Sequence, residues 1–596
     1  MSKIPLRSEI PEKYTWNLQD IFESREAWEQ GYAETEKVIA SFRTFEGHVA
    51  EKPVEAVKAY YELLHHLMPV MSYASLSREC DNGNSEAQAM SGRAGMLAVQ
   101  ARSATSFLEP ELLQMTESEL SGLAKNPELS DYSEYFRLLI QQKNHLLSKE
   151  EEHLLALMGH VINGPDDIFT MLSSVDMKFP DMQMPDGSIE PLTEGTYSRY
   201  RESTNREVRK MSFDHIFSTY ASFGSTIAAI YGTSVKKDNA LAQARHYASA
   251  LNAAMDPLEI PVAVYDNLIQ VIHESIPLLT RYLNLRKKLM GVDELHMYDL
   301  YAPIVEDADM VLPYEDAFNL VLEGLHPMGE DYLDVLRTAR DHRWIDVYPT
   351  KDKSSGAFSM GSLADVHPYV LLNHNDNLDC AFTIAHELGH SMHSYYSNLK
   401  QPAPKRHYSL FVAEVASTCN EAVMMRHLLE KFTDRRQRAF LLNHFLEQFR
   451  TTCFRQTMFA EFERKAHEMA EKNQPLTKDT LNKAYYDLNM LYYGNGCKVD
   501  NLIANEWMRI PHFYRAYYVY VYATGLCAAV SISEKILNGG ADALKHYREF
   551  LSAGCSVPPI EALKLAGIDM STPEPLRKAM QVFAQTLDQF EEATKE

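Results

Sequence analysis

Two histidines and a glutamate in the segment TIAHELGHSMH, residues 383–393, have a spacing that could bind a metal ion. His386 and His390 are four residues apart, so on a helix both imidazoles lie on one face, where they can bind a single Zn²⁺. Glu387 could then take the proton of a zinc-bound water as that water attacks a carbonyl carbon. Chance matches usually fall on charged, solvated helices, whereas the residues around these three are uncharged. The segment therefore predicts half of a hydrolytic zinc site.

A zinc enzyme needs a third protein ligand and an open position for water. His393 is seven residues after His386 and returns to the same helix face. However, seven residues rise about 10 Å along a helix axis, which is too far for one ion to bind both imidazoles. We expect His393 to pack, to support a ligand or to contact substrate, and we expect the third ligand in another segment.

The best candidate for that ligand is Glu414, a lone acid in the apolar helical run LFVAEVASTCNEAVMMRHLLE. Buried carboxylates are rare unless they are paired or bound to a metal. The 23 residues between His390 and Glu414 leave room for a loop and a returning helix. The alternative is a partly exposed helix acid without a ligand role. Glu421, two turns further on, could orient a zinc histidine, whereas Cys419 is a poorer ligand candidate than a well-placed carboxylate.

The segment before the motif predicts how its helix is positioned. HPYVLLNHN, residues 367–375, contains a short β-type run, and Pro368 at its start suits an edge strand. Asp376 or Asn377 is then a plausible N-cap for a helix that begins at about Leu378 and continues through the motif. We therefore expect a small sheet beside the metal-binding helix.

Helical periodicity dominates the rest of the chain. A capping box at 148–151 leads into HLLALMGHVI, and helices are also predicted in AVKAYYELLHHLMPVM and PLRKAMQVFAQTLDQF. The segment 177–193, MKFPDMQMPDGSIEPLT, predicts a small hairpin with its turn at Pro185–Gly187. We place a domain boundary after this hairpin, with an N-terminal helical lobe at 1–200 and a catalytic domain at 201–596.

Composition limits the classes of function. The 596 residues have the composition of a soluble globular protein, and the formal net charge of −24 argues against nucleic acid or an anionic membrane as a partner. We find no secretory signal, no membrane-spanning run, no P-loop and no dinucleotide fingerprint. The seven scattered cysteines include no CxxC pair and predict free thiols in a reducing cytoplasm.

The HExxH motif together with FVAEVASTCNE resembles the M3 family of zinc metallopeptidases, and within it the oligoendopeptidase F group. The resemblance extends over nearly the whole chain: it includes IPEKYTWNLQDIF, SSGAFSMG, PYVLLNHN, IPHFYRAYYVYVYATG and LSAGCSVPPIEALKLAGIDMSTPEP, in this order.

The resemblance implies a mainly α-helical protein whose two lobes enclose a deep substrate channel, with a small β-sheet near the zinc helix. It implies one Zn²⁺ per chain, held by His386, His390 and Glu414, with Glu387 as the general base. The implied activity is hydrolysis of internal bonds in short unfolded peptides, by Glu387-assisted attack of a zinc-bound water.

The aromatic segment HFYRAYYVYVYATG, residues 512–525, has two interpretations. Its five tyrosines could form an aromatic core, or a phenol could stabilise the oxyanion that develops during attack on a peptide bond. The family has a tyrosine pair at i, i+3, and Tyr517 and Tyr520 match that spacing. His512 and Tyr514 are further candidates. In the residues before the tyrosine pair, however, the sequence departs from the pattern of the thimet oligopeptidases, another group of this family.

Three alternatives remain open at the level of sequence. SSGAFSMG, residues 354–361, could pair with an extended peptide or be an ordinary flexible loop. An aminopeptidase of another HExxH clan would need a fixed acidic cluster for the substrate amine, commonly a G-x-M-E-N segment, and we find none. A catalytically silent peptide-binding protein would have no reason to keep Glu387 beside intact ligands.

Overall fold

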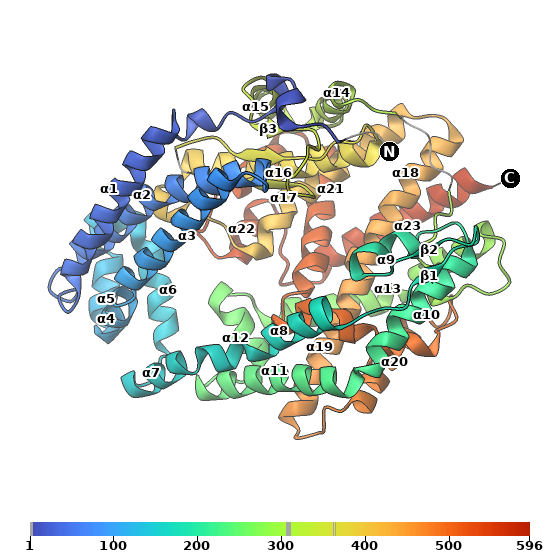
Figure 1. The fold of residues 1–596 in the computed structure, drawn as a ribbon, viewed down its shortest axis with the longest axis horizontal. Helices are drawn as coiled ribbons and strands as arrows, with labels where there is room; N and C mark the ends of the chain where they lie inside the picture. The colour runs from blue at the N-terminus through green and yellow to red at the C-terminus, as the bar shows by residue number, and fades with distance from the viewer. Residues whose placement is uncertain (1–3, 306–310, 362, 364, 596) are drawn as a thin grey trace. The chain divides into compact units, whose positions relative to one another are not determined.

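The computed structural model describes residues 4–305, 311–361, 363 and 365–595, and it confirms the mainly α-helical fold class. Helices account for 72% of the chain, and the sheets of the described residues have only two and three strands. In Figure 1 helices dominate every part of the ribbon. The packing divides the chain into two units, each assembled from separate segments.

Unit 1 comprises residues 1–144, 309–428 and 532–568. Its helices are α1 (Arg25–Phe42), α2 (Pro53–Cys80), α3 (Ser85–Thr105), α4 (Leu108–Gln114), α5 (Glu117–Ala124), α6 (Ser133–Lys143), α14 (Tyr314–Gly324), α15 (Glu330–Asp341), α16 (Leu378–Lys400), most of α17 (Leu410–Lys431) and α22 (Pro559–Leu565). Trp28, Leu97 and Phe136 are fully buried in the core that α1–α6 form.

Unit 2 comprises residues 145–308, 429–531 and 569–596. Its helices are α7 (Lys149–Leu157), α8 (Gly159–Met171), α9 (Glu194–Arg201), α10 (Arg206–Ser222), α11 (Gly224–Ala244), α12 (Ala250–Met255), α13 (Val262–Leu289), α18 (Arg435–Gln448), α19 (Arg455–Glu471), α20 (Lys478–Tyr493) and α23 (Glu574–Thr594). The long helix α21 (Tyr520–Leu551) contains the residues at which the chain passes from unit 2 to unit 1. The boundary that we predicted at 200/201 lies inside unit 2, at the end of α9, and stays a prediction.

Most of the local predictions are confirmed. Ser148 and Glu151 form the expected capping box before α7, and the helices predicted in 56–71 and 575–590 belong to α2 and α23. The hairpin consists of β1 (Met182–Gln183) and β2 (Ile189–Glu190), which pair antiparallel around the left-handed Gly187.

The prediction that the strand after Pro368 lies at a sheet edge is wrong. The three-stranded sheet has the order β3 (Ile345–Asp346), β5 (Tyr369–Leu371), β4 (Phe358–Met360), so β5 is central and pairs with both neighbours. Pro368 lies just before the first residue of β5, where its missing N–H removes no hydrogen bond from the ladder. β3 and β4 are the two edge strands of this sheet.

The N-terminal segment is fixed to this sheet through a buried carboxylate. Asp346 on β3 is 2% exposed and contacts the guanidinium of Arg7 at 2.6 Å and the Nζ of the fully buried Lys353 at 2.8 Å. Trp16 packs on Tyr369 of β5 with ring centroids 6.0 Å apart. These contacts stabilise the sheet against which the predicted metal-binding helix packs, since a buried charge is tolerated only when it is paired.

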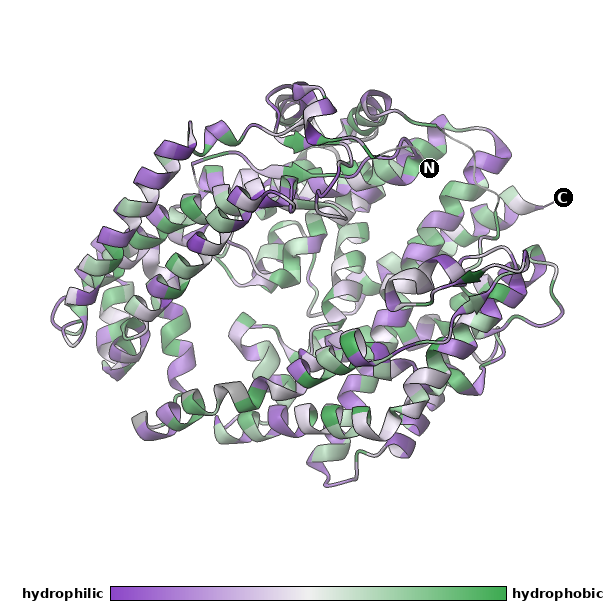
Figure 2. Cartoon of the chain, viewed as in Figure 1, coloured by the Kyte–Doolittle hydropathy of each residue, from purple (hydrophilic) through white to green (hydrophobic). Residues whose placement is uncertain are grey.

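Hydropathy varies along the helices rather than marking any of them as uniformly apolar. Hydrophilic and hydrophobic residues alternate along their length in Figure 2, and within the described residues no helix is long and apolar enough to cross a membrane.

Candidate metal centre

The HExxH segment lies on α16, which begins where the sequence predicts. Asn377 is the N-cap, and its side chain accepts a hydrogen bond from the backbone N–H of Cys380. Ala385 and Leu388 are buried at 0% and 1% exposure, so the inward face of α16 packs against the rest of unit 1. The cap and the apolar face fix the start and the rotation of the helix that carries His386 and His390.

Helix α17 lies directly against α16 (Figure 1). A Cβ at Gly389 would lie 2.5 Å from Ser417 Cα and 2.7 Å from the Ala416 carbonyl oxygen, so only glycine permits this approach of the two backbones. The side-chain amide of Asn420 donates a hydrogen bond to the Ala385 carbonyl oxygen at 3.0 Å. Glycine inside an apolar helix was the sequence signal for this contact, and our sequence analysis did not use it.

The contact brings Glu414 to the two histidines. Glu414 Oε2 lies 3.4 Å from His386 Nε2 and 3.6 Å from His390 Nε2, and one ligand atom from each of the three residues lies within 4.8 Å of the others. A tetrahedral zinc ion with bonds of ~2.0–2.1 Å separates its ligand atoms by about 3.3 Å, so the two measured separations fit such an ion. All three side chains are partly exposed, which is compatible with a fourth position open to water.

Glu421, also on α17, completes the surroundings of His386. Its Oε1 lies 2.5 Å from His386 Nδ1, which leaves Nε2 free to face Glu414. Burial lowers the pKa of His386, but Glu414 and Glu421 outweigh it and raise that pKa to about 10. The imidazoles in turn hold the pKa of Glu414 well below its usual range. The group therefore attracts a positive charge, which a divalent cation would supply.

Glu387 is more deeply buried than the other two glutamates of the site. It is 7% exposed, and burial raises the pKa of its carboxyl group above the ordinary value, against the opposing effect of the two histidines. A carboxylate with a raised pKa is a better proton acceptor near neutral pH than an exposed one. This environment suits the role of general base.

His393 lies apart from this group, in the core of unit 1. It is 1% exposed and stacks on Tyr408 with ring centroids 3.7 Å apart and an angle of 5°. Burial and the neighbouring His390 lower its pKa to about 3, so the ring is neutral. These contacts describe a packing residue.

The edge strand β4 runs beside α16. Ser359 Oγ lies 2.9 Å from Ser391 Oγ, and a Cβ at Gly361 would lie 2.2 Å from Ser394 Cβ. β5 is the one strand that pairs with β4 in the described part of the chain, which leaves the other edge of β4 without a strand. A cavity of about 530 Å³ adjoins β4, with Met360 and Tyr408 among its lining residues.

The aromatic candidates of residues 512–525 belong to unit 2, and three of them lie in its core. Tyr517 and Tyr520 are 5% and 3% exposed, and both pack on Tyr265. Tyr517 has a left-handed backbone (φ 54°), and its N–H donates to Oε1 of the buried Glu463 at 2.7 Å. Tyr514 stacks on Phe169 with centroids 4.5 Å apart. The three side chains therefore lie in an aromatic core, and the catalytic role that the resemblance implies for them stays a prediction.

His512 is exposed and has two neighbours that our sequence analysis did not single out. Its Nε2 lies 3.5 Å from the hydroxyl of Tyr522, which lies 3.5 Å from the hydroxyl of Tyr518. The available signal was the cluster of tyrosines itself, since Tyr518 lies just before α21 and only Tyr522 lies on it. Tyr518 and Tyr522 are partly exposed, whereas Tyr517 and Tyr520 are buried.

Two histidines one turn apart, a glutamate from a second helix and a buried glutamate beside them form the type of site found in HExxH metallopeptidases. Residues 199–582 match the model of "Peptidase family M3", and residues 111–179 match that of "Oligopeptidase F". The chain belongs to peptidase family M3, as the sequence resemblance indicated, and is a metalloendopeptidase that hydrolyses peptide bonds.

Relatives match over the whole chain. "Oligopeptidase PepF" of Bacillus subtilis is 43% identical over 595 residues, which cover 99% of this chain and 89% of that protein. The crystal structure of a putative peptidase from Chlamydophila abortus superposes with a TM-score of 0.92 at 32% identity, covering 99% of this chain and 100% of the other. That of oligoendopeptidase-F from Enterococcus faecium gives 0.74 at 36% identity, covering 95% and 99%.

The Gly389→Ala substitution tests the dependence of the site on helix contact. The added methyl group forces the two backbones apart, so we expect the free energy of unfolding to fall by about 1–3 kcal/mol and the zinc content per chain to decrease. Thermal unfolding and elemental analysis measure the two effects.

Gly92→Ala on α3 is the matched control, since a Cβ there would meet no atom within 4 Å. Removing the flexibility of an exposed helical glycine should stabilise the protein by about 0.5–1 kcal/mol without changing its zinc content. A Gly389→Ala protein with the stability and zinc content of the wild type would contradict this view of the site.

Proposed function

We propose that this protein is a zinc-dependent oligoendopeptidase that hydrolyses internal bonds of short, unfolded peptides. The observation that carries the proposal is the convergence of ligand atoms from His386, His390 and Glu414 within 4.8 Å, next to the buried Glu387. The zinc dependence of family M3 peptidases supports the choice of metal.

His386, His390 and Glu414 would hold one zinc ion per chain. Zinc bound there would polarise the scissile carbonyl group and lower the pKa of a water molecule. Glu421 engages Nδ1 of His386, so that Nε2, which faces Glu414, would be the nitrogen that binds zinc. The partial exposure of the three ligands leaves access for water and substrate.

Glu387 acts as the proton carrier of the reaction. It takes a proton from the attacking water and passes it to the leaving amine, which converts a poor leaving group into a neutral one. Burial supports this role, because it raises the pKa of Glu387 and so makes its carboxylate a stronger proton acceptor than an exposed one.

The free edge of β4 supports a preference for extended peptides. A peptide that adds to this edge would be held by backbone hydrogen bonds on both sides of the scissile bond, which suits cleavage of internal bonds and excludes folded chains. The cavity beside β4 could receive a substrate side chain. An aminopeptidase would instead bind the free amine of its substrate and would fail on blocked peptides.

The remaining parts of the proposal rest on general properties of the chain. Free cysteines at all seven positions support a reducing, cytoplasmic location. The net charge of −24 disfavours nucleic acid and anionic membranes as partners.

Glu387→Gln removes the proton acceptor and keeps the size of the side chain. We expect kcat on quenched fluorescent peptides to fall by at least about 10²-fold, with zinc content unchanged. Glu128→Gln, at an exposed residue of unit 1, should retain wild-type activity. A folded, zinc-loaded Glu387→Gln protein with the wild-type rate would refute the assigned role.

The role of Tyr517 or Tyr520 in holding the oxyanion rests on the sequence resemblance alone. Tyr520→Phe keeps the buried ring and removes the hydroxyl group, so a packing role predicts an unchanged kcat. An oxyanion role predicts a loss of about 10²–10³-fold in kcat with little change in KM. Tyr231→Phe, at another buried tyrosine of unit 2, is the control. Steady-state kinetics of the two variants distinguish the roles.

A further inference from the structure

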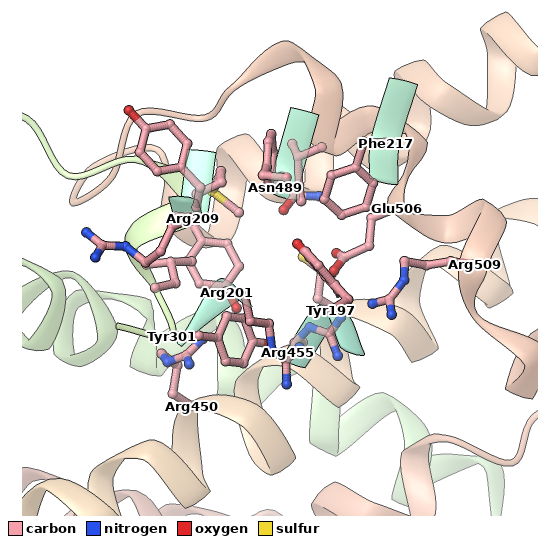
Figure 3. Close-up of a pocket in the computed structure, with 17 residues that line it drawn as sticks. Tyr197, Arg201, Arg209, Phe217, Tyr301, Arg450, Arg455, Asn489, Glu506 and Arg509 are labelled. Atoms are coloured by element: carbon pink, nitrogen blue, oxygen red, sulfur yellow. Dashed lines mark hydrogen bonds and ion pairs between the residues drawn. The ribbon is translucent and has the colours of Figure 1, made fainter. Parts of the chain in front are cut away.

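A second feature of the molecule, separate from the metal centre, is a small basic cavity in unit 2 (Figure 3). The cavity has a volume of about 30 Å³, and its charged lining residues are Glu506 and five arginines: Arg201, Arg209, Arg450, Arg455 and Arg509. This concentration of arginine is unexpected in a chain whose net charge is −24.

Four of these residues lie in or next to two irregular helical segments. Arg450 lies in the π-helical segment η11 (Phe449–Phe454), and Arg455 directly follows it at the start of α19. Glu506 and Arg509 lie on η12 (Asn501–Arg509), a 3₁₀ stretch of nine residues. Both geometries are uncommon at such lengths, and π-segments occur frequently at functional sites.

Four of the five arginines are neutralised by carboxylates. The pairs are Arg209 with Asp299 at 2.8 Å, Arg450 with Glu447 at 2.6 Å, Arg455 with Glu506 at 2.6 Å and Arg509 with Glu194 at 2.5 Å. Because these pairs are complete, they do not by themselves require a further ligand.

Arg201 is the exception. Its Nε is buried and has no hydrogen-bond acceptor among the described residues. The carboxylate of Glu202 is 3.8 Å away, beyond hydrogen-bonding distance, and belongs to a side chain that is 55% exposed. A buried donor without an acceptor is rare in folded proteins and costs about 1–3 kcal/mol. Arg201 therefore has the longest ion pair of the five arginines and a side chain that is 26% exposed, and its Nε, like that of Arg209, is a buried donor without a hydrogen-bond acceptor among the described residues.

Tyr301 lies where the positive charges converge. The guanidinium carbons of Arg201 and Arg450 lie 3.9 and 4.5 Å from the centroid of its ring. Burial raises the pKa of Tyr301, but Arg455, Arg450 and Arg201 together outweigh burial and lower it. Most other buried tyrosines of the described residues have raised pKa values, so the potential at this hydroxyl group favours negative charge.

The volume of the cavity limits what could balance this charge. A space of about 30 Å³ accommodates one or two water molecules, or an ion of similar size. Phosphate, sulfate and a peptide carboxylate with its attached chain are too large.

We propose that this cavity binds one small monovalent anion of the size of chloride, held by Arg201 and by the Tyr301 hydroxyl. The anion accepts a hydrogen bond from Arg201 Nε, which no acceptor in the described residues satisfies. An anion that binds the folded state alone stabilises it in proportion to the logarithm of its concentration once the site is saturated. The proposal does not depend on the proposed peptidase activity.

Thermal unfolding of the full-length protein tests the proposal. Sodium chloride replaces sodium gluconate at constant ionic strength, so that screening of surface charges stays the same. We expect the Tm of the wild type to rise by about 1–3 °C and to keep rising with the logarithm of the chloride concentration above the dissociation constant. Arg201→Gln should lose this response. Arg199→Gln is the matched control, because Arg199 lies on the same helix, is 64% exposed and pairs with Glu190.

Bromide in a crystal of the wild-type protein gives an independent readout that needs no variant. We expect an anomalous difference peak in the cavity, next to Arg201 and the Tyr301 hydroxyl. Absence of the peak at a saturating bromide concentration would overturn the proposal and leave water as the occupant. An equal chloride response in the wild type and a folded Arg201→Gln protein would overturn it as well.

Discussion

The candidate metal centre depends on one contact, the close approach of the α16 and α17 backbones at Gly389. HExxH places two ligands and a base on a single helix, but a metal ion also needs a group from outside that helix. Because Gly389 has no side chain, Ser417 can lie against it, and Glu414 and Glu421 then reach His386 from the same neighbouring helix. The sheet and the Asn377 cap fix where α16 begins.

The metal centre favours positive charge, and the cavity of unit 2 favours negative charge. At the metal centre, Glu387, Glu414 and Glu421 surround two imidazoles, and the high pKa of His386 shows that this group attracts positive charge. In the cavity of unit 2, arginines exceed the carboxylates in the lining, and the lowered pKa of Tyr301 shows that negative charge is favoured. In each place an ion of the opposite sign would compensate the charges that the chain gathers there.

The parts of this structure that could be predicted are those governed by local sequence. The spacing of His386 and His390, the Asn377 cap and the turn at Gly187 each depend on a few consecutive residues, and the structure agrees with all three. Glu414 could be found because a lone acid in an apolar helix is unusual. The position of β5 in its sheet could not, since Pro368 restricts only its own N–H and says nothing about neighbours that come from distant segments. The surroundings of Arg201 likewise become visible only when distant segments of unit 2 are assembled.

The central claim is that this protein cuts internal peptide bonds with the help of one zinc ion, which His386, His390 and Glu414 hold. Mass spectrometry of the products from a pool of N-acetylated peptides, with and without a chelator, tests it most directly. Our account predicts internal fragments from the blocked peptides, their loss on chelation and their return when zinc is added back. Cleavage that survives complete removal of the metal, or that requires a free N-terminus, would contradict it.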